Sequence, residues 1–292
     1  MTTAVAAPFR FFALQVVTTR RLGPSLVRIT FAGPELRHFR SDGRDQSLSL
    51  FLPHPGQDAP VVPLERGDEW WRGWRELPDD VRAVMRSYTL RARRADAEGR
   101  TTEIDIDFVL HGVREEAGVS AEAGPASRWA ARAAAGDRVL LLGPALADNR
   151  AIRFRPPEDT DLVLLWADET ALPATTAVLE TLPAGTRARV WLEVPHAGDV
   201  QDLATDADAE ITWFVRERSA APGQDSPMAL DELRAVELPT ARRPYVWIAG
   251  EAGCVKQLRR HFVGERGIDR RRVTFVGYWR RGLTEEQLRE EA

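Results

Sequence analysis

The sequence predicts an antiparallel β barrel followed by an α/β domain built on a parallel sheet. Its first half holds short segments rich in Val, Ile, Leu, Phe and Thr, separated by Gly, Pro and Asp residues. Its second half alternates nearly continuous apolar segments with amphipathic ones, which is typical of a parallel sheet covered on both faces. Residues 148–161, between the halves, are rich in charge and contain two prolines. We therefore expect one domain over residues 1–150 and a second over 151–292.

Six segments of the first half have the composition of strands. Strands at this spacing favour a closed barrel, because closure removes exposed sheet edges. The insertion Pro53–Val84 interrupts them, and we expect it to cover the barrel or one end of a ligand bound there. Its tryptophans Trp70, Trp71 and Trp74 are better explained as anchors of the insertion than as ligand contacts. The predicted strands are Phe11–Thr18, Leu26–Phe31, Gln46–Leu52, Ser87–Arg93, Thr102–Leu110 and Arg138–Leu142.

The second half has the pattern of a nucleotide-binding domain, although the glycine-rich fingerprint of ordinary dinucleotide dehydrogenases is absent. In a parallel sheet, ligands bind beyond the carboxyl ends of the strands. The segment Asp168-Glu169-Thr170 follows the first strand, and Asp168 or Thr170 is expected to cap the next helix, Leu172–Leu182. The loops Gly250-Glu251 and Tyr278-Trp279 follow later strands, so we expect the three loops to converge. The predicted strands are Leu162–Trp166, Arg189–Val194, Glu210–Val215, Tyr245–Ala249 and Val273–Gly277.

Composition excludes several classes of protein. The chain has 292 residues, of which 43% are hydrophobic, so two domains can each bury a core. A formal net charge of -4 gives no electrostatic case for nucleic-acid binding. The single cysteine excludes an internal disulfide framework and an iron–sulfur cluster held by cysteines alone. Since we identify neither a signal peptide nor an apolar segment of about 20 residues, we expect a cytoplasmic protein that does not enter a membrane.

The segment Arg86-Ser87-Tyr88-Thr89-Leu90-Arg91 combines two guanidinium groups, a phenol ring and a β-branched hydroxyl. Strand alternation sends Arg86, Tyr88 and Leu90 to one face and the other three side chains to the opposite face. A guanidinium can clamp a diphosphate, while Tyr88 lies along an aromatic ring system and Thr89 offers its hydroxyl to the polar edge of that ring. This combination matches the shape of a flavin. An edge strand with solvated arginines explains the spacing equally well.

A second motif favours phosphate binding. A strand is expected to end at Asp107-Phe108-Val109-Leu110-His111-Gly112. A helix is then expected to start within Gly124-Pro125-Ala126-Ser127-Arg128-Trp129, with Ser127 as its cap. A helix start made of small residues leaves N–H groups unpaired and gives a pyrophosphate room to approach.

Five motifs in one order resemble the siderophore-interacting protein family, which are FAD-containing ferric-siderophore reductases related to the ferredoxin-reductase superfamily. The resemblance extends from about Phe9 to about Gly282. It implies that electrons pass from NADH or NADPH through FAD to a ferric siderophore, and that reduction of Fe(III) to Fe(II) releases the iron. The motifs are Arg86-Ser87-Tyr88-Thr89, Asp107–Gly112, Gly124–Trp129, Asp168–Pro173 and Gly277-Tyr278-Trp279-Arg280.

The resemblance also implies roles for these residues. Arg86, Tyr88 and Thr89 would hold the flavin, with Tyr88 against the isoalloxazine and Thr89 near its N5 edge. No catalytic acid–base residue and no protein metal site is expected, because the cofactor carries the difficult step and the iron arrives chelated. Arg91 could equally be a solvated strand arginine, and Trp279 could anchor the last segment rather than shield the flavin. The remaining flavin residues would be Ser87, Arg91, Asp107, Phe108, Val109, His111, Gly124, Pro125, Ala126, Ser127 and Trp129, and the nicotinamide residues Asp168, Glu169, Thr170, Gly250, Glu251, Tyr278 and Trp279.

Glu193 bears on the choice of nicotinamide cofactor. It ends the second strand of the sheet, where an acid favours two ribose hydroxyls and repels a 2′-phosphate. This position favours NADH, although His196, Arg187 and Arg189 leave NADPH open. Cys254 follows a glycine, as does the cysteine that ferredoxin reductases place beside the nicotinamide. Because free cysteines are usually buried, a small buried residue is the better interpretation.

Ser49 stands where the family often has a lysine, so a catecholate preference does not follow from the resemblance. Arg128, Arg280 and Arg281 are candidate replacements for docking an anionic chelate. Two other functions are kept: a flavin reductase or electron-transfer flavoprotein with a protein partner, such as a ferredoxin donor, and a siderophore-binding protein without flavin. Tight FAD retention together with oxidation that depends on a ferric chelate would distinguish a ferric-siderophore reductase from these two alternatives. We expect a monomer, with a short polar helix over Leu283–Ala292.

Overall fold

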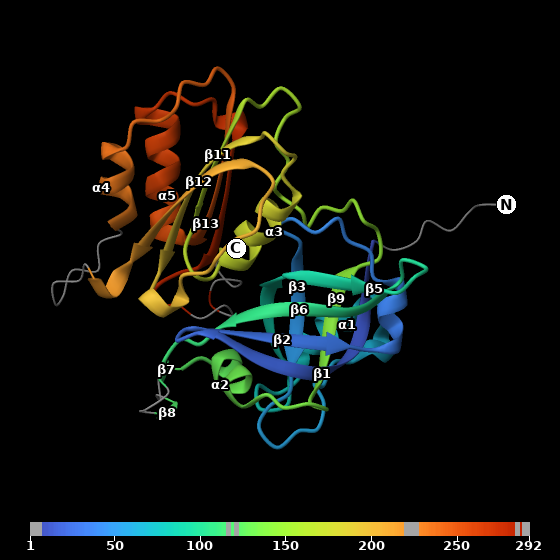
Figure 1. Cartoon of the computed structure of the whole chain (residues 1–292). Coiled ribbons are helices and arrows are strands. Elements are labelled where there is room, and N and C mark those ends of the chain that lie inside the picture. Colours follow the sequence, from blue (N-terminus) through green and yellow to red (C-terminus); the bar gives the residue numbers. More distant parts are fainter. Residues whose placement is uncertain (1–7, 115–117, 120–122, 219–227, 284–286, 288–292) are drawn as a thin grey trace. The chain divides into compact units, whose positions relative to one another are not determined.

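The computed structural model describes residues 8–114, 118–119, 123–218, 228–283 and 287, which form two compact units. The described residues up to 42 and from 46 to 151 belong to the first unit, and residues 43–45 and those from 152 onward belong to the second. Figure 1 shows the strands of the first unit in blue to green and those of the second in yellow-green to red. No helix within these described ranges is long and apolar enough to cross a membrane.

The first unit is built on one antiparallel sheet of seven strands in the order β4-β3-β9-β1-β2-β6-β5. Alternate residues of β1, among them Phe12, Leu14 and Val16, are buried in the barrel core. The strands are β1 (Phe9–Gly23), β2 (Leu26–Ala32), β3 (Ser47–Leu52), β4 (Val84–Thr89), β5 (Ala92–Ala95), β6 (Thr101–Val109) and β9 (Arg138–Pro144).

The segment that carries the Arg-Ser-Tyr-Thr motif closes the sheet on itself. β4 pairs with β3, whereas β5 pairs with β6 at the opposite edge of the sheet. Between them, the N–H of Leu90 donates to the carbonyl of Gln46 and the N–H of Arg91 donates to the carbonyl of Asp105. The prediction of one continuous strand over Ser87–Arg93 is therefore wrong, because this segment changes its partner strand at Leu90-Arg91.

The insertion covers the outside of the barrel. Trp74 packs with Phe51, Met85 and Leu140, which face away from the barrel core, and the ring of Trp70 lies 4.9 Å from that of Phe11. These two tryptophans are anchors, as predicted. The insertion contains η2 (Leu64–Glu69) and α1 (Trp70–Glu76), and the other short elements of this unit are η1 (Pro34–His38), β7 (Val113–Arg114), β8 (Gly118–Val119) and α2 (Pro125–Arg132).

The second unit is a five-stranded parallel sheet in the order β12-β11-β10-β13-β14. Every residue of the central strand β10 is buried, as a sheet covered on both faces requires. The strands are β10 (Leu162–Ala167), β11 (Arg187–Val194), β12 (Asp208–Val215), β13 (Pro244–Glu251) and β14 (Val273–Trp279). The helices are α3 (Leu172–Thr181), η3 (Ala197–Asp199), η4 (Arg216–Arg218), α4 (Met228–Ala235), α5 (Ala252–Arg260), the π-helical turn η5 (His261–Glu265) and η6 (Arg270–Arg272).

The segment expected to link the domains is packed rather than free. Ile152 and Phe154 are buried, and the Asp45 carboxylate accepts hydrogen bonds from the N–H groups of Arg153 and Phe154 at 3.0 and 2.9 Å. The same carboxylate accepts a hydrogen bond from the indole of Trp247 on β13 at 3.1 Å. Residues 43–45 therefore belong with the second unit. Apart from Leu283 and Gln287, the predicted helix over Leu283–Ala292 lies outside the described residues.

Candidate functional site

Three segments predicted to hold a flavin come together in the first unit. The ring of Tyr88 on β4 lies 4.4 Å from that of Phe108 on β6, and the Phe108 ring lies 5.8 Å from the indole of Trp129 on α2. The Ser127 hydroxyl donates a hydrogen bond to the main-chain carbonyl of Val109 at 3.0 Å. These contacts join β4, the end of β6 and α2 into one cluster, although the residues lie far apart in the sequence.

The turn after β6 brings the end of that strand against the start of α2. Gly112 has a φ of 70°, and a Cβ atom at this position would lie 2.9 Å from the main-chain nitrogen of Ala123, so this turn requires glycine. The helix then starts at Pro125, with Gly124 as its N-cap residue. The prediction that Ser127 caps the helix is wrong, because Ser127 lies inside it and its hydroxyl reaches β6 instead.

The start of α2 offers the donors and the space that a flavin diphosphate needs. Among the described residues, no side chain caps the helix, and none has a heavy atom within 4 Å of where a Cβ atom on Gly124 would lie. The approach to the first-turn N–H groups is therefore open, and the positive end of the helix dipole favours an anion there. α2 contacts β4, which supplies the half-buried Arg86 and the half-buried ring of Tyr88. This set of donors and this ring fit FAD.

Several of the predicted flavin residues are held inside the protein. The Asp107 carboxylate accepts two hydrogen bonds from the Arg28 guanidinium, at 2.7 and 2.8 Å, and Phe108 is fully buried. Thr89 and Trp129 are also buried. Ser87 and His111 are exposed, while Arg91 and Val109 are half-buried. The buried members of the set build the walls of the barrel end, and the exposed and half-buried members are the ones that a ligand can reach.

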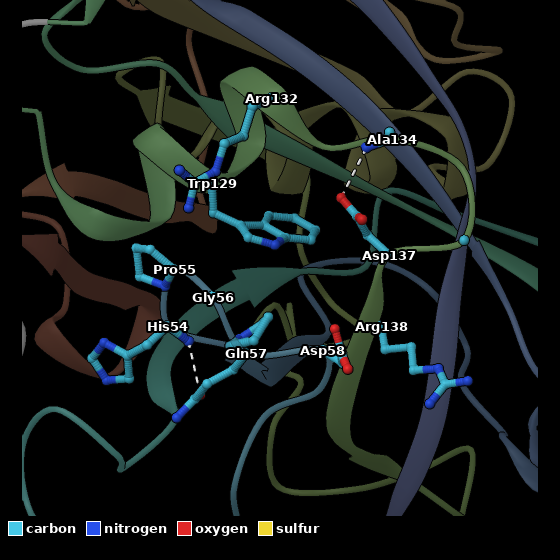
Figure 2. Close-up of a pocket in the computed structure, with 12 residues that line it drawn as sticks. His54, Pro55, Gly56, Gln57, Asp58, Trp129, Arg132, Ala134, Asp137 and Arg138 are labelled. Carbon is cyan, nitrogen blue, oxygen red and sulfur yellow. Dashed lines mark hydrogen bonds between the residues drawn. The ribbon is translucent and has the colours of Figure 1, made fainter.

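A hollow of about 600 Å³ lies beside α2 in the same unit. Figure 2 shows the indole of Trp129 near its centre, with His54 and Gln57 across from it. The loop after β3 forms one wall, where the His54 N–H donates to the Gln57 side-chain oxygen at 3.0 Å. Of the predicted flavin residues, Trp129 lines this hollow, whereas Tyr88 and Thr89 do not.

In the second unit, the carboxylate of Asp168 joins the three predicted loops. Its Oδ1 atom accepts hydrogen bonds from the N–H and hydroxyl of Thr170 at 2.9 and 2.5 Å. Its Oδ2 atom accepts from the N–H of Glu251 and from the indole nitrogen of Trp279, both at 2.8 Å. Because these residues follow or end β10, β13 and β14, the predicted convergence of the three loops is confirmed.

Burial sets the electrostatics of Asp168, which is 3% exposed. Desolvation and then the nearby charge of Glu169 raise the pKa of Asp168 to about 7, while hydrogen bonds from Thr170 and Trp279 act to lower it. A Cβ atom at Gly250 would lie 2.5 Å from Asp168 Oδ2, so glycine is required beside this carboxylate. The prediction that Asp168 or Thr170 caps α3 is wrong: Ala171 is the N-cap residue, and no side chain in the described ranges caps the helix.

Arg216 is a further residue of this edge that no sequence motif marked. Its guanidinium donates to Glu169 Oε1 at 2.6 Å and to Glu193 Oε1 at 3.1 Å, and both glutamates are buried. The other carboxylate oxygen of Glu169 is buried with no hydrogen-bond partner in the described part of the chain. Arg216 directly follows β12, so the rule that selected Asp168 from the end of β10 could also have found it.

Two further side chains near this edge are buried. Desolvation raises the pKa of Glu193, whereas the charge of Arg216 lowers it. Cys254 is 6% exposed, and burial, followed by the negative charges of Glu193 and Asp168, raises the pKa of its thiol. The interpretation of Cys254 as a small buried residue is confirmed.

Two family models match this chain. Residues 15–148 match the siderophore-interacting FAD-binding domain, and residues 160–282 match the siderophore-interacting protein model. The ferric vibriobactin reductase ViuB of Vibrio cholerae is 29% identical over 279 residues, which cover 95% of this chain and 92% of that protein. The NADPH-dependent ferric-chelate reductase of Escherichia coli is 30% identical over 279 residues, which cover 92% and 93%.

Solved structures agree with these matches. The siderophore-interacting protein SipS from Aeromonas hydrophila aligns with a TM-score of 0.72 and 32% identity, over 97% of this chain and 96% of that one. A ferredoxin reductase from carbazole 1,9a-dioxygenase aligns with a TM-score of 0.60 at 15% identity, over 94% of this chain and 71% of that one, which shows a shared fold. The predicted fold class, a barrel followed by a parallel-sheet domain, is confirmed.

Proposed function

Because this chain belongs to the siderophore-interacting protein family, we propose that it carries electrons from a reduced nicotinamide cofactor through FAD to ferric siderophores. FAD itself is confirmed as the cofactor by the match of residues 15–148 to an FAD-binding domain. The names of two relatives, a ferric vibriobactin reductase and a ferric-chelate reductase, support reduction of chelated iron as the reaction. The observation that carries the proposal is the contact of β4, β6 and α2, which joins the predicted flavin motifs in one cluster.

In the first unit, the residues of this cluster bind and orient the cofactor. Bound FAD supplies the chemistry, since it accepts a hydride and can pass single electrons to Fe(III). The Arg86 guanidinium and the N–H groups at the start of α2 neutralise the diphosphate. Tyr88 is held against Phe108, so its ring presents a fixed flat surface to the isoalloxazine. Thr89 is buried at the end of β4, where it forms part of the wall behind this surface.

In the second unit, the carboxyl ends of the strands bind the nicotinamide cofactor. Glu169, Thr170, Gly250, Glu251 and Tyr278 line this edge through the loops that Asp168 gathers. The two carboxylate oxygens of Asp168 accept hydrogen bonds from four donors within the protein. Asp168 therefore positions these loops and does not itself contact the cofactor.

We propose NADH as the preferred donor. Arg216 is the cation that follows β12, and two buried carboxylates, Glu169 and Glu193, already neutralise it. A 2′-phosphate beside Arg216 would meet the two carboxylates that already pair with this guanidinium, which is unfavourable in a partly buried setting. The ribose hydroxyls of NADH have no such penalty and can donate to carboxylate oxygens.

An anaerobic absorbance titration tests the proposal. The purified protein should contain FAD, NADH should bleach its absorbance near the flavin maximum, and NADPH should do so less efficiently. Addition of ferric siderophores, with a ferrous-iron trap present, should restore the flavin spectrum and form the Fe(II) complex. A protein that binds no FAD, or reduced flavin that ferric siderophores fail to reoxidise, would overturn the proposal. Reoxidation by an iron–sulfur protein but not by chelates would instead favour an electron-transfer flavoprotein.

A further inference from the structure

Three arginines on the first unit form a cluster that no carboxylate neutralises. Arg10 lies at the start of β1, Arg37 lies in η1 and Arg40 follows η1, and all three are exposed. None of them forms an ion pair with a residue in the described part of the chain. Arginines in other places of this unit behave differently, since Arg28 pairs with Asp107 at 2.7 Å and Arg94 pairs with Asp105 at 2.7 Å.

Main-chain carbonyls and an aromatic ring hold the cluster in place. Arg40 donates to the carbonyls of Arg37 and Phe39 at 2.7 and 2.9 Å, and Arg37 donates to the carbonyl of Pro34 at 3.3 Å. The guanidinium of Arg10 lies 5.7 Å from the centre of the Phe12 ring. These partners fix the side chains without cancelling their charge, so the ordered cluster keeps its positive potential.

The three arginines are neighbours in space. Arg10 pairs with Gly143 across β1 and β9, and the N–H of Arg40 donates to the carbonyl of the next residue, Pro144, at 3.1 Å. Arg37 donates to the imidazole of His38 at 3.0 Å. Desolvation, and then the charges of Arg37, Arg10 and Arg40, lower the pKa of the exposed His38.

Glu35 is a carboxylate near this cluster. Its charge acts on His38 in the opposite direction, but its Oε2 atom accepts a hydrogen bond from the N–H of Ala13 at 3.1 Å rather than from an arginine. The cluster therefore keeps an excess of positive charge, on a chain whose formal net charge is -4. A patch of the opposite sign to the whole chain is suited to steer and orient an acidic partner.

We propose that Arg10, Arg37 and Arg40 form a docking surface for the acidic face of a partner protein. Each guanidinium has its own contact within the protein, and the three arginines come from β1, from η1 and from the residue two positions after η1. Such an array matches several carboxylates on a protein surface better than it matches a single phosphate. This inference does not rest on the flavin chemistry, because none of the three arginines belongs to the proposed flavin or nicotinamide sites.

Fluorescence anisotropy with labelled poly-L-glutamate tests the docking surface on the full chain with FAD bound. The cluster variant carries Arg10→Gln, Arg37→Gln and Arg40→Gln. The matched control variant carries Arg20→Gln, Arg75→Gln and Arg93→Gln, which removes the same charge from exposed arginines of the same unit. We expect the cluster variant to bind at least about tenfold more weakly and the control variant to change by less than about twofold, with an effect that fades as salt is added.

Two results would overturn the inference. Equal losses in the two variants would mean that poly-L-glutamate responds to net charge alone. Saturable binding of inorganic pyrophosphate that displaces poly-L-glutamate would mean that the arginines form a small-anion site. Thermal melts followed by circular dichroism check folding, and the single exposed substitution Arg37→Gln, expected to weaken binding about threefold, replaces the cluster variant if that variant unfolds. Flavin reduction by NADH should be unchanged in the cluster variant, so this test and the test of the proposed function fail separately.

Discussion

The indole nitrogen of Trp279 donates a hydrogen bond to Asp168 Oδ2 at 2.8 Å, and this contact ties the last strand of the parallel sheet to its central strand. The same oxygen accepts from the N–H of Glu251 at the end of β13. One buried carboxylate thus fixes three loops, and the edge where the nicotinamide cofactor is proposed to bind depends on it. The first prediction concerns this carboxylate.

Replacing Asp168 with Asn should destabilise the second unit. An amide keeps the size of the side chain but places an NH₂ group opposite donors such as Trp279, so at least one buried donor loses its acceptor. We expect a loss of about 2 kcal/mol in the free energy of unfolding. Urea denaturation followed by tryptophan fluorescence measures it, with the exposed Asp206→Asn as the matched control. An Asp168→Asn variant as stable as the control would show that the carboxylate does not organise the loops.

Replacing Glu193 with Gln should relax the selection against NADPH. The substitution removes one of the two carboxylates that neutralise Arg216, so the guanidinium can attract a 2′-phosphate. We expect the ratio of kcat/KM for NADPH to that for NADH to rise by up to about tenfold, which corresponds to about 1.4 kcal/mol. Glu232→Gln removes an exposed carboxylate of α4 and serves as the control. An unchanged ratio would remove Glu193 and Arg216 from the choice of donor.

Replacing Arg86 with Ala should weaken FAD binding. A charge-assisted contact with a diphosphate contributes about 1.5–3 kcal/mol, so the dissociation constant should rise by roughly 10- to 100-fold. Flavin content after gel filtration and fluorescence titration of the apoprotein measure the loss. Arg100→Ala, which removes an exposed arginine paired with Asp96, should retain wild-type affinity. Stoichiometric FAD with unchanged affinity in the Arg86 variant would place the diphosphate elsewhere.

Acid should destabilise the protein partly through Glu265. Hydrogen bonds from Arg234 and then from His261 lower the pKa of Glu265 from 4.5 to about 2. Because the folded-state pKa lies below the unfolded one, this contribution to stability is complete above pH 4.5 and is lost as the pH falls toward 2. In Glu265→Gln, the thermal midpoint should therefore fall less steeply over this range than in the wild type. The exposed Glu158→Gln should keep the wild-type slope, and identical slopes in all three proteins would contradict the assignment.

The periodic segments of the sequence predict most strands to within a few residues. The predicted strand Leu162–Trp166 corresponds to Leu162–Ala167, and Arg138–Leu142 corresponds to Arg138–Pro144. Apolar runs and alternation suffice for these elements because each strand buries the faces that its own pattern marks. Helix α4 (Met228–Ala235) was not predicted, because its eight residues are too few for a helical period to stand out in the sequence.

Local sequence patterns did not predict the helix caps or the partners of the polar side chains. Ser127 and Asp168 both have the chemistry of helix caps, yet each turns to a strand or loop that is distant in sequence. Asp107 was expected at the flavin, and the structure pairs it with Arg28 on the neighbouring strand. A polar side chain forms hydrogen bonds with the groups that the fold brings close to it. The distances between such groups cannot be inferred from a local sequence pattern.

The sequence by itself determined the two-part architecture, the strands that build it and the segments at which a flavin and a nicotinamide cofactor are expected. Composition and periodicity are sufficient for this, because burial of apolar side chains is a property of each segment. Only the tertiary structure decided that the Arg-Ser-Tyr-Thr segment changes partner strand to close the barrel and that Arg216 bridges two glutamates. It also decided that Arg10, Arg37 and Arg40 form no ion pair with any residue whose placement is described. Ion pairs and strand pairings join residues that are distant in the sequence. Which residues pair therefore depends on how the whole chain is folded.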